Sequence, residues 1–216
     1  MSAQRKFLDN GVPEWIVTFA DLMTLLFCFF VLLTTLSVQP KNCNGIKNYL
    51  NQRKAAFKNY ELRSSKLECV LSLPSDYLFK SGGDAIQRRA FVSLFPMFKS
   101  IKTMPEHKDD LIIVAGHTDN VPIRTKRFPS NWELSSARAT NIARFLVDRV
   151  KYPDSRVSIN AFGEGRPKVS YVDRSGKAKT GATLRNARRI NRRVEIILAS
   201  QPKAEGSKKI LFDGRH

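Results

Sequence analysis

Acidic side chains are scarce in this chain of 216 residues. Asp and Glu together number 19 against 37 Lys and Arg, which gives a formal net charge of +18 at pH 7. That balance excludes an acidic disordered chain, and a hydrophobic content of 42% excludes a wholly disordered one. Taken alone, the positive excess suggests nucleic acid or an anionic surface as a partner.

Histidine is scarce too, and the three residues lack neighbours at metal-ligand spacing: His107, His117 and His216. No nucleophile and base occur in a recognisable pairing either, so we expect neither a metal site nor an enzyme. The arginine-rich segment 185–193 contains no aromatic residue and no nucleic-acid motif, so a nucleic-acid partner is not expected.

One long apolar run spans residues 15–38, where 18 of 24 residues are apolar and only Asp21 is ionisable. As a helix it would extend about 36 Å, enough to cross about 30 Å of hydrocarbon with some tilt. A cleaved signal peptide fits poorly, because its apolar part is shorter and carries no carboxylate. The run therefore predicts a single transmembrane helix over 15–38, preceded by a segment 1–14.

Asp21 lies about 9 Å into this helix, where a carboxylate costs roughly 2.5–3.5 kcal/mol. It shares one helical face with Thr24, Cys28, Val31 and Thr35, at spacings of 3, 4, 3 and 4 residues. This small or hydroxylated face suits contact with other helices or a wet path. A carboxyl kept neutral by burial, or one near the interface, is the simpler interpretation. We favour a relay in which Asp21, with Thr24, loads and unloads a proton or a sodium ion.

The charge is divided unevenly along the chain. Residues 1–40 sum to −1, so the other 176 residues carry +19. Basic residues near the apolar run are more numerous on its C-terminal side, which the positive-inside rule would place in the cytoplasm. Because that rule weakens for large translocated domains, the orientation depends on what the soluble region binds.

The connector 39–66 is polar and basic, and Pro40 ends the apolar run. A weak amphipathic stripe runs through it: Ile46, Tyr49, Leu50 and Phe57. Two interpretations stay open, a solvated periplasmic linker and a short interfacial helix that lies across the mouth of a channel as a plug.

Residues 67–200 have globular patterns, and 201–216 form a basic tail that we expect to be disordered. Strands are predicted at 67–73, 111–116, 157–162 and 193–198, and helices from an N-cap at Asp84 to about 103, at 131–150 and at 183–192. This β-α-β-α-β-α-β order indicates an α/β (α+β) sandwich with helices packed on a sheet.

Four motifs in this region resemble the successive motifs of the OmpA-like peptidoglycan-binding domain: GHTDNVPI (116–123), NWELSSARA (131–139), GEGRP (163–167) and NRRVEI (191–196). Joined to WIVTFADLMTLLFCFFVLL, they resemble the MotB/PomB family of flagellar motor stator proteins over residues 12–198. The resemblance implies an OmpA-like fold after a single transmembrane helix in the bacterial inner membrane. It places the N-terminus in the cytoplasm and the C-terminal domain in the periplasm.

The family also implies partners. A MotA/PomA-type multi-span subunit would surround this chain, five copies to a homodimer of it. No cofactor is implied, and the complex would transport H⁺ or Na⁺. Such a complex converts ion motive force into motility and serves chemotaxis. FADLMTLLFCFF looks closer to the sodium-type PomB members than to proton-type MotB, and the coupling ion stays open.

The resemblance further implies a site for the diaminopimelate of the peptidoglycan stem peptide, which presents an ammonium and a carboxylate close together. Asp119 would take the ammonium and Arg138 the carboxylate, because a guanidinium offers a bidentate fork. The residues expected to complete the pocket are Thr118, Asn131, Leu134 and Arg193. The alternative is a structural Asp119–Arg138 salt bridge, a kind of pair that is common on protein surfaces.

Three cysteines form an odd set that dictates no pairing. Cys28 belongs to the membrane helix, whereas Cys43 and Cys69 lie on the presumed periplasmic side. A disulfide between these two, within or between chains, is compatible with that compartment, and the sequence leaves it open.

Other functions fit the same features. A passive tether between membrane and wall would need no ion site, and Asp21 with its polar face argues against it. A stator-like subunit of another rotary machine, in gliding, secretion or phage defence, would have the same ion site and anchor. The connector is short for the family, so we expect the linker to extend when the stator engages.

Overall fold

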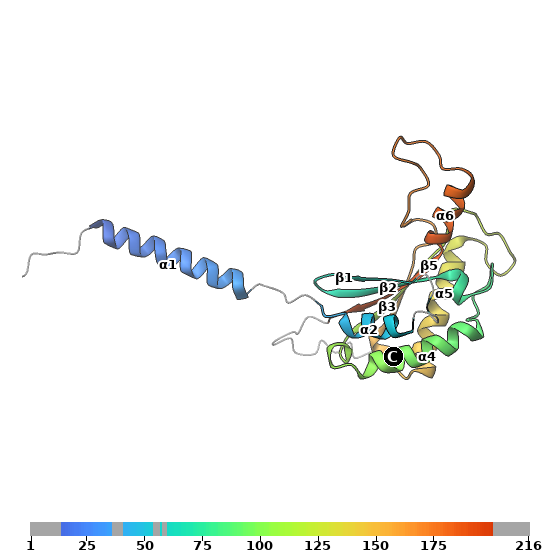
Figure 1. The fold of residues 1–216 in the computed structure, drawn as a ribbon, viewed down its shortest axis with the longest axis horizontal. Coiled ribbons are helices and arrows are strands. Elements are labelled where there is room, and N and C mark those ends of the chain that lie inside the picture. Colours follow the sequence, from blue (N-terminus) through green and yellow to red (C-terminus); the bar gives the residue numbers. More distant parts are fainter. Residues whose placement is uncertain (1–13, 36–40, 54–56, 58–59, 201–216) are drawn as a thin grey trace, which may run out of the picture. The chain divides into compact units, whose positions relative to one another are not determined.

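The structure is a computed structural model that describes residues 14–35, 41–53, 57 and 60–200 of the chain. It divides into two units, Met1–Gln39 and Pro40–His216. The first contains one described helix, α1 (Glu14–Thr35), and the second contains a sheet with its covering helices (Figure 1).

Helix α1 is long and apolar enough to cross a membrane over Trp15–Thr34, with a mean hydropathy of 2.5. Every side chain described in it is exposed, so none of its apolar surface is buried within this chain. The helix predicted over 15–38 is confirmed as far as Thr35, and residues 36–38 lie outside the described residues.

The second unit is built on a five-stranded sheet of order β1-β2-β5-β3-β4 (Figure 1). Neighbouring strands are antiparallel except β3 and β4, which are parallel and joined through α5. The strands are β1 (Glu61–Ser64), β2 (Glu68–Pro74), β3 (Leu111–His117), β4 (Val157–Ala161) and β5 (Arg193–Ala199). The helices are α2 (Asn44–Gln52), α3 (Ser75–Leu78), α4 (Arg88–Thr103), α5 (Asn131–Arg144) and α6 (Gly181–Asn191), with short 3₁₀ turns at Pro105–His107 and Asp154–Arg156.

The core lies between one face of this sheet and the helices α2, α4 and α5. Side chains alternate along a strand, so every second residue of β5 faces the core: Val194, Ile196 and Leu198. They pack with apolar residues of the helices, among them Leu94, Phe98 and Ile142. The predicted strands and their order with the helices are confirmed, and the fold is the mixed α/β sheet that the sequence indicated.

Two helix boundaries differ from the predicted ones. Asp84 does not cap α4, which begins at Arg88 after Gln87. Its buried carboxylate instead accepts hydrogen bonds from Arg127 at 2.8 Å and from Asn141 at 3.0 Å, which joins α5 to the loop before α4. The predicted helix 131–150 is α-helical to Arg144 and continues as a π-helical turn over Phe145–Arg149.

The compact unit begins earlier in the chain than the predicted boundary at residue 67. Strand β1 pairs with β2, and helix α2 buries the amphipathic stripe of the connector in the main core: Ile46, Tyr49 and Leu50, with Phe57 beyond the helix. The apolar stripe therefore packs into the core of this domain. Burial of each large apolar side chain stabilises the fold by about 1.5–3 kcal/mol.

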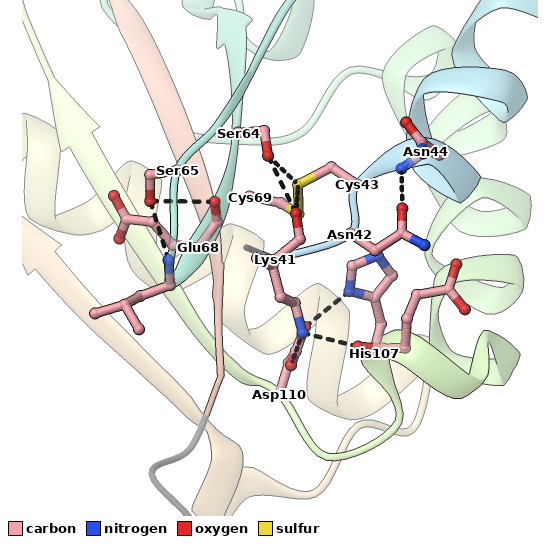
Figure 2. Close-up of a disulfide and its surroundings, with 12 residues drawn as sticks. Lys41, Asn42, Cys43, Asn44, Ser64, Ser65, Glu68, Cys69, His107 and Asp110 are labelled. Carbon is pink, nitrogen blue, oxygen red and sulfur yellow. Dashed lines mark hydrogen bonds and ion pairs between the residues drawn. A yellow bond between two sulfur atoms is a disulfide. The ribbon is translucent and has the colours of Figure 1, made fainter. Parts of the chain in front are cut away.

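A disulfide and a buried ion cluster fasten the start of this segment (Figure 2). Cys43, at the N-cap of α2, is bonded to Cys69 of β2. The Lys41 Nζ lies 2.5 Å from Asp110 Oδ1, and His107 Nδ1 lies 2.8 Å from Asp110 Oδ2 (Figure 2). The same Lys41 ammonium donates to the carbonyl of Glu106 at 2.7 Å. The question that the sequence left open is thus resolved as a disulfide within one chain.

The disulfide closes a chain segment of 26 residues, so we expect it to stabilise the second unit by about 3 kcal/mol, chiefly by restricting the unfolded chain. The double variant Cys43→Ser, Cys69→Ser should lower the free energy of unfolding by that amount. Urea unfolding of the detergent-solubilised chain, followed by circular dichroism, measures it. Cys28→Ser is the matched control and should leave the midpoint unchanged. An unchanged midpoint in the double variant would show that the packing of α2 suffices without the bond.

Candidate functional site

The six residues predicted to contact the wall lie at the end of β3, on α5 and at the start of β5. All are at least nine-tenths buried, with exposed fractions between 4% and 7%: Thr118, Asp119, Asn131, Leu134, Arg138 and Arg193. Two of them lie in the loop that leaves β3, three lie on α5, which packs on β3, and the sixth begins the neighbouring strand β5.

A glycine lets α5 lie close to β3. A Cβ at Gly116 would meet the backbone oxygen of Ser135 at 2.2 Å, a distance at which the two elements would have to move apart. The close approach places Asn131, at the start of α5, beside the loop that leaves β3. Its side-chain amide donates to the backbone oxygens of Asp119, at 3.4 Å, and Val121, at 3.1 Å.

The neighbouring backbone is held as well. The Thr118 N–H donates to the carbonyl of Gly163 at 2.8 Å, which ties the loop to the GEGRP motif. The Thr118 hydroxyl donates to the Asp119 carbonyl at 3.1 Å. Leu134 is buried but lies outside the main apolar cluster. These contacts fix the direction in which the Asp119 side chain leaves the loop.

The carboxylate of Asp119 is paired with an arginine other than the predicted one. Its Oδ2 accepts from Arg192 Nη1 at 2.7 Å, and its Oδ1 accepts from the N–H of Val121 at 3.1 Å. The alternative of a structural Asp119–Arg138 salt bridge is therefore wrong, because among the described residues the ion pair of Asp119 is made with Arg192.

Arg192 also binds Asp76, so one guanidinium joins two carboxylates. Its Nη2 lies 2.9 Å from Asp76 Oδ2, and its Nε donates to Asp76 Oδ1 at 3.2 Å. The hydrogen bonds that Arg192 donates to Asp76 come first among the influences that raise the Arg192 pKa, partial burial opposes them, and Asp119 adds to them. Sequence reasoning missed Arg192 and Asp76. One signal was available: adjacent residues of an extended segment point in opposite directions, and Arg192 directly precedes the strand that begins at Arg193.

Arg138 keeps part of its guanidinium free of protein contacts. Its Nε donates to the carbonyl of Gly83 at 2.9 Å, and its guanidinium carbon lies 5.2 Å from the centre of the Phe79 ring. Burial lowers the pKa of Arg138, with the charges of Asp76, Arg192 and Asp119 acting in opposite senses. Within the described part of the chain, the two terminal nitrogens form no hydrogen bond, so the fork can receive a ligand carboxylate.

The structure does not bring Arg193 to Asp119. Arg193 lies on the sheet face opposite the core, where its Nε contacts Glu195 Oε1 at 2.8 Å and its terminal nitrogens reach the carbonyl of Arg166. His117 Nε2 lies 3.5 Å from Glu195 Oε2. Burial raises the Glu195 pKa, but His117 and Arg193 more than offset this and lower it to about 2. In this arrangement Arg193 connects β5 to the segment that contains Arg166.

The second candidate site lies on α1. The Thr24 hydroxyl donates to the backbone oxygens of Ala20 and Asp21, each at 2.9 Å. The Asp21 side chain is exposed, one turn before Thr24 on the same helical face. Among the described residues, no group of three His, Cys, Asp or Glu side chains could hold a metal ion.

Sequence comparisons identify two regions of the chain. Residues 78–181 match the OmpA family, and residues 4–53 match the family described as membrane MotB of the proton-channel complex MotA/MotB. Motility protein B of Bacillus subtilis is 31% identical over 142 residues, which are 66% of this chain and 49% of that protein. Motility protein B of Helicobacter pylori is 32% identical over 99 residues, 45% of this chain and 37% of that protein. The chain thus matches about half, or less, of these two relatives.

A third relative is similar over nearly its whole length. The uncharacterized protein YtxE of B. subtilis is 27% identical over 232 residues, 88% of this chain and 90% of that protein.

Solved structures agree with these matches. The periplasmic domain of H. pylori MotB is 25% identical with a TM-score of 0.56, covering 68% of this chain and 86% of that one. The cell wall anchor of the T6SS from Pseudomonas aeruginosa has a TM-score of 0.59 at 24% identity, covering 72% of this chain and 97% of that one, and shows likeness of fold alone. The chain belongs to the MotB family of stator proteins, a structural rather than enzymatic family, and carries an OmpA-like domain.

Proposed function

We propose that this protein is the B subunit of an ion-driven flagellar motor stator. Asp21 of α1 takes up and releases the transported proton or sodium ion, and the OmpA-like domain grips peptidoglycan. A MotA/PomA-type multi-span subunit surrounds two copies of this chain, five to two, and does the work on the rotor. The N-terminus lies in the cytoplasm and the domain in the periplasm, because the wall lies outside the inner membrane. One observation carries the proposal. The chain combines a membrane-length helical span that contains a single acid, Asp21, with a domain that contains a buried acid paired with an arginine.

The ion site is supported by what surrounds Asp21. All described side chains of α1 are exposed, so the carboxylate needs cover from partner helices to avoid hydrocarbon. The Thr24 hydroxyl donates its hydrogen bond to backbone oxygens, so only its oxygen lone pairs remain to bind a cation. Loading the carboxylate with a cation neutralises a charge at the helix surface, which is a local change able to drive a conformational one.

The wall site is supported by the two ends of the diaminopimelate zwitterion. The free fork of Arg138 can bind its carboxylate in a bidentate manner. Asp119 retains acceptor capacity beyond the bonds from Arg192 and Val121, because a carboxylate has about four lone-pair positions. Its position beside Asp76 adds a second negative group near the ligand ammonium. Thr118, Asn131 and Leu134 shape this site, and we assign Arg193 a supporting role.

The tether to the membrane helix is short. Between Thr35 of α1 and Lys41 the chain can span about 20 Å at most, even if fully extended. Beyond Lys41, the ion cluster with Asp110 and the Cys43–Cys69 disulfide hold the chain on the domain. Extension of the linker when the stator engages is therefore confined to the residues before Cys43 while this bond persists.

The ion relay predicts that Asp21→Asn abolishes rotation while the protein still inserts in the membrane, because an amide cannot take up a cation as a carboxylate does. Rotation of tethered cells that express the partner subunit, with immunoblots of the membrane fraction, measures both effects. Thr34→Val, on the far side of the same helix, is the matched control and should rotate normally. Normal rotation of Asp21→Asn would favour the passive tether.

The wall site predicts that Asp119→Asn with Arg138→Lys lowers the affinity for purified sacculi about a hundredfold or more, since each change removes a charged hydrogen bond worth about 1.5–3 kcal/mol. Co-sedimentation of the detergent-solubilised protein measures it, with urea unfolding as a check on folding. The control Asp154→Ala with Arg174→Ala removes an exposed acid and an exposed arginine, and should bind as wild type. Equal binding by both pairs would contradict the site.

A further inference from the structure

A single tryptophan stands out on the surface of the OmpA-like domain. Trp132, in the first turn of α5, has 54% of its surface exposed. The other tryptophan of the chain is Trp15, in α1. Among the described residues, the Trp132 indole N–H has no hydrogen-bond partner and the ring stacks on no other aromatic or cationic group. A large apolar ring of this kind, exposed on a folded domain, is a candidate for ligand contact.

One edge of the ring lies near a glycine. Gly163 has φ +49, and a Cβ there would lie 3.5 Å from the backbone nitrogen of Trp132 and 3.6 Å from Cδ1 of its ring, which are ordinary van der Waals distances. The positive φ favours glycine at this position of the GEGRP motif, which passes beside the edge of the indole. The ring thus has this motif beside one edge, while 54% of the residue's surface stays exposed.

Trp132 borders a shallow groove of about 690 Å³ along the exposed side of α5. The charged residues of this groove are two acids and two arginines: Asp84, Glu133, Arg127 and Arg144. In a chain of net charge +18 this balance is unusual, and it suits a neutral ligand rather than a polyanion. The side chains of Ser136, Thr140 and Arg144 form no hydrogen bond with other described residues, so they can bind hydroxyl and amide groups.

The groove adjoins the proposed stem-peptide site through residues that are neighbours in sequence. Asn131 holds the Asp119 loop, and Trp132 borders the groove. Gly83 accepts the hydrogen bond from Arg138, and Asp84 borders the groove. In the wall polymer, a diaminopimelate at the third position of the stem is separated from its sugar by about 10 Å of extended peptide.

We propose that this groove binds the glycan strand of the wall, with the apolar face of an N-acetylated sugar stacked on Trp132. The inference rests on the proposed function, since it places the sugar next to the stem peptide held by Asp119 and Arg138. Wall sugars are neutral where the lactyl carboxylate is joined to the peptide, which agrees with the balanced charges of the groove. The protein then reads two chemically distinct parts of one polymer, and the affinity for an intact fragment exceeds that for its peptide alone.

The test uses the full-length chain in detergent with Trp15→Phe, so that Trp132 is the sole source of tryptophan fluorescence. The probes are triacetylchitotriose, which has no peptide, a diaminopimelate-containing stem tripeptide, and the disaccharide–tripeptide. Chitotriose should shift the fluorescence saturably at millimolar concentration. The disaccharide–tripeptide should bind about fivefold more tightly than the tripeptide, the contribution expected of one aromatic stack.

Variants show whether Trp132 causes the fivefold gain in affinity. Calorimetry measures their binding, because Trp132→Ala combined with Trp15→Phe leaves no tryptophan fluorescence. Trp132→Ala should lose the fivefold gain and keep the affinity for the tripeptide, whereas Val172→Ala, an exposed apolar residue outside the groove, should keep both. Equal affinities of the wild type for tripeptide and disaccharide–tripeptide, with no response to chitotriose, would overturn the glycan site. Loss of tripeptide binding with an intact chitotriose response would overturn the stem-peptide site instead.

Discussion

Helix α5 lies so close to strand β3 that position 116 has room only for the hydrogen of a glycine. The rest of the candidate wall site depends on this approach. It lets Asn131 hold the backbone around Asp119, and it brings Arg138 to the loop at Gly83. Because packed interiors transmit strain, a displacement of α5 by a single methyl group would alter the separation of the acid and the arginine. The site is thus specified by a backbone contact as much as by its charged side chains.

Four of the acids in this basic chain lie in the interior, where they connect elements of the fold. Asp84, Asp110, Asp119 and Glu195 are all buried, and each is paired with at least one basic side chain. Buried carboxylates need such partners, since an unpaired charge in a protein interior is strongly destabilising. The surplus of Lys and Arg therefore lies mainly outside these clusters, where it is compatible with a domain close to an anionic wall.

Local patterns were sufficient for β2 to β5, for α1, α4, α5 and α6, and for the residue types of the site, but they did not predict β1 or α3. The long apolar run predicted α1, a short continuous apolar run predicted β3, and alternation predicted β2 and β4, because such patterns depend on neighbours along the chain. Asp119 and Arg138 were found through motifs whose fold-level context was correct. Asp84 was misassigned as a helix cap because a capping residue and a buried acceptor have the same side chain, and only the position of Asn141 and Arg127 distinguishes them.

The sequence by itself determined that a membrane-length helix with one acid precedes an α/β domain of the OmpA-like kind. Only the tertiary structure decided that the connector stripe packs into the core, that Cys43 joins Cys69, and that Arg192 rather than Arg138 pairs with Asp119. The partners in these contacts are remote in sequence, and the sheet order β1-β2-β5-β3-β4 brings them together. No periodic signal records such pairings, because they depend on how whole elements pack and not on the residues beside each partner.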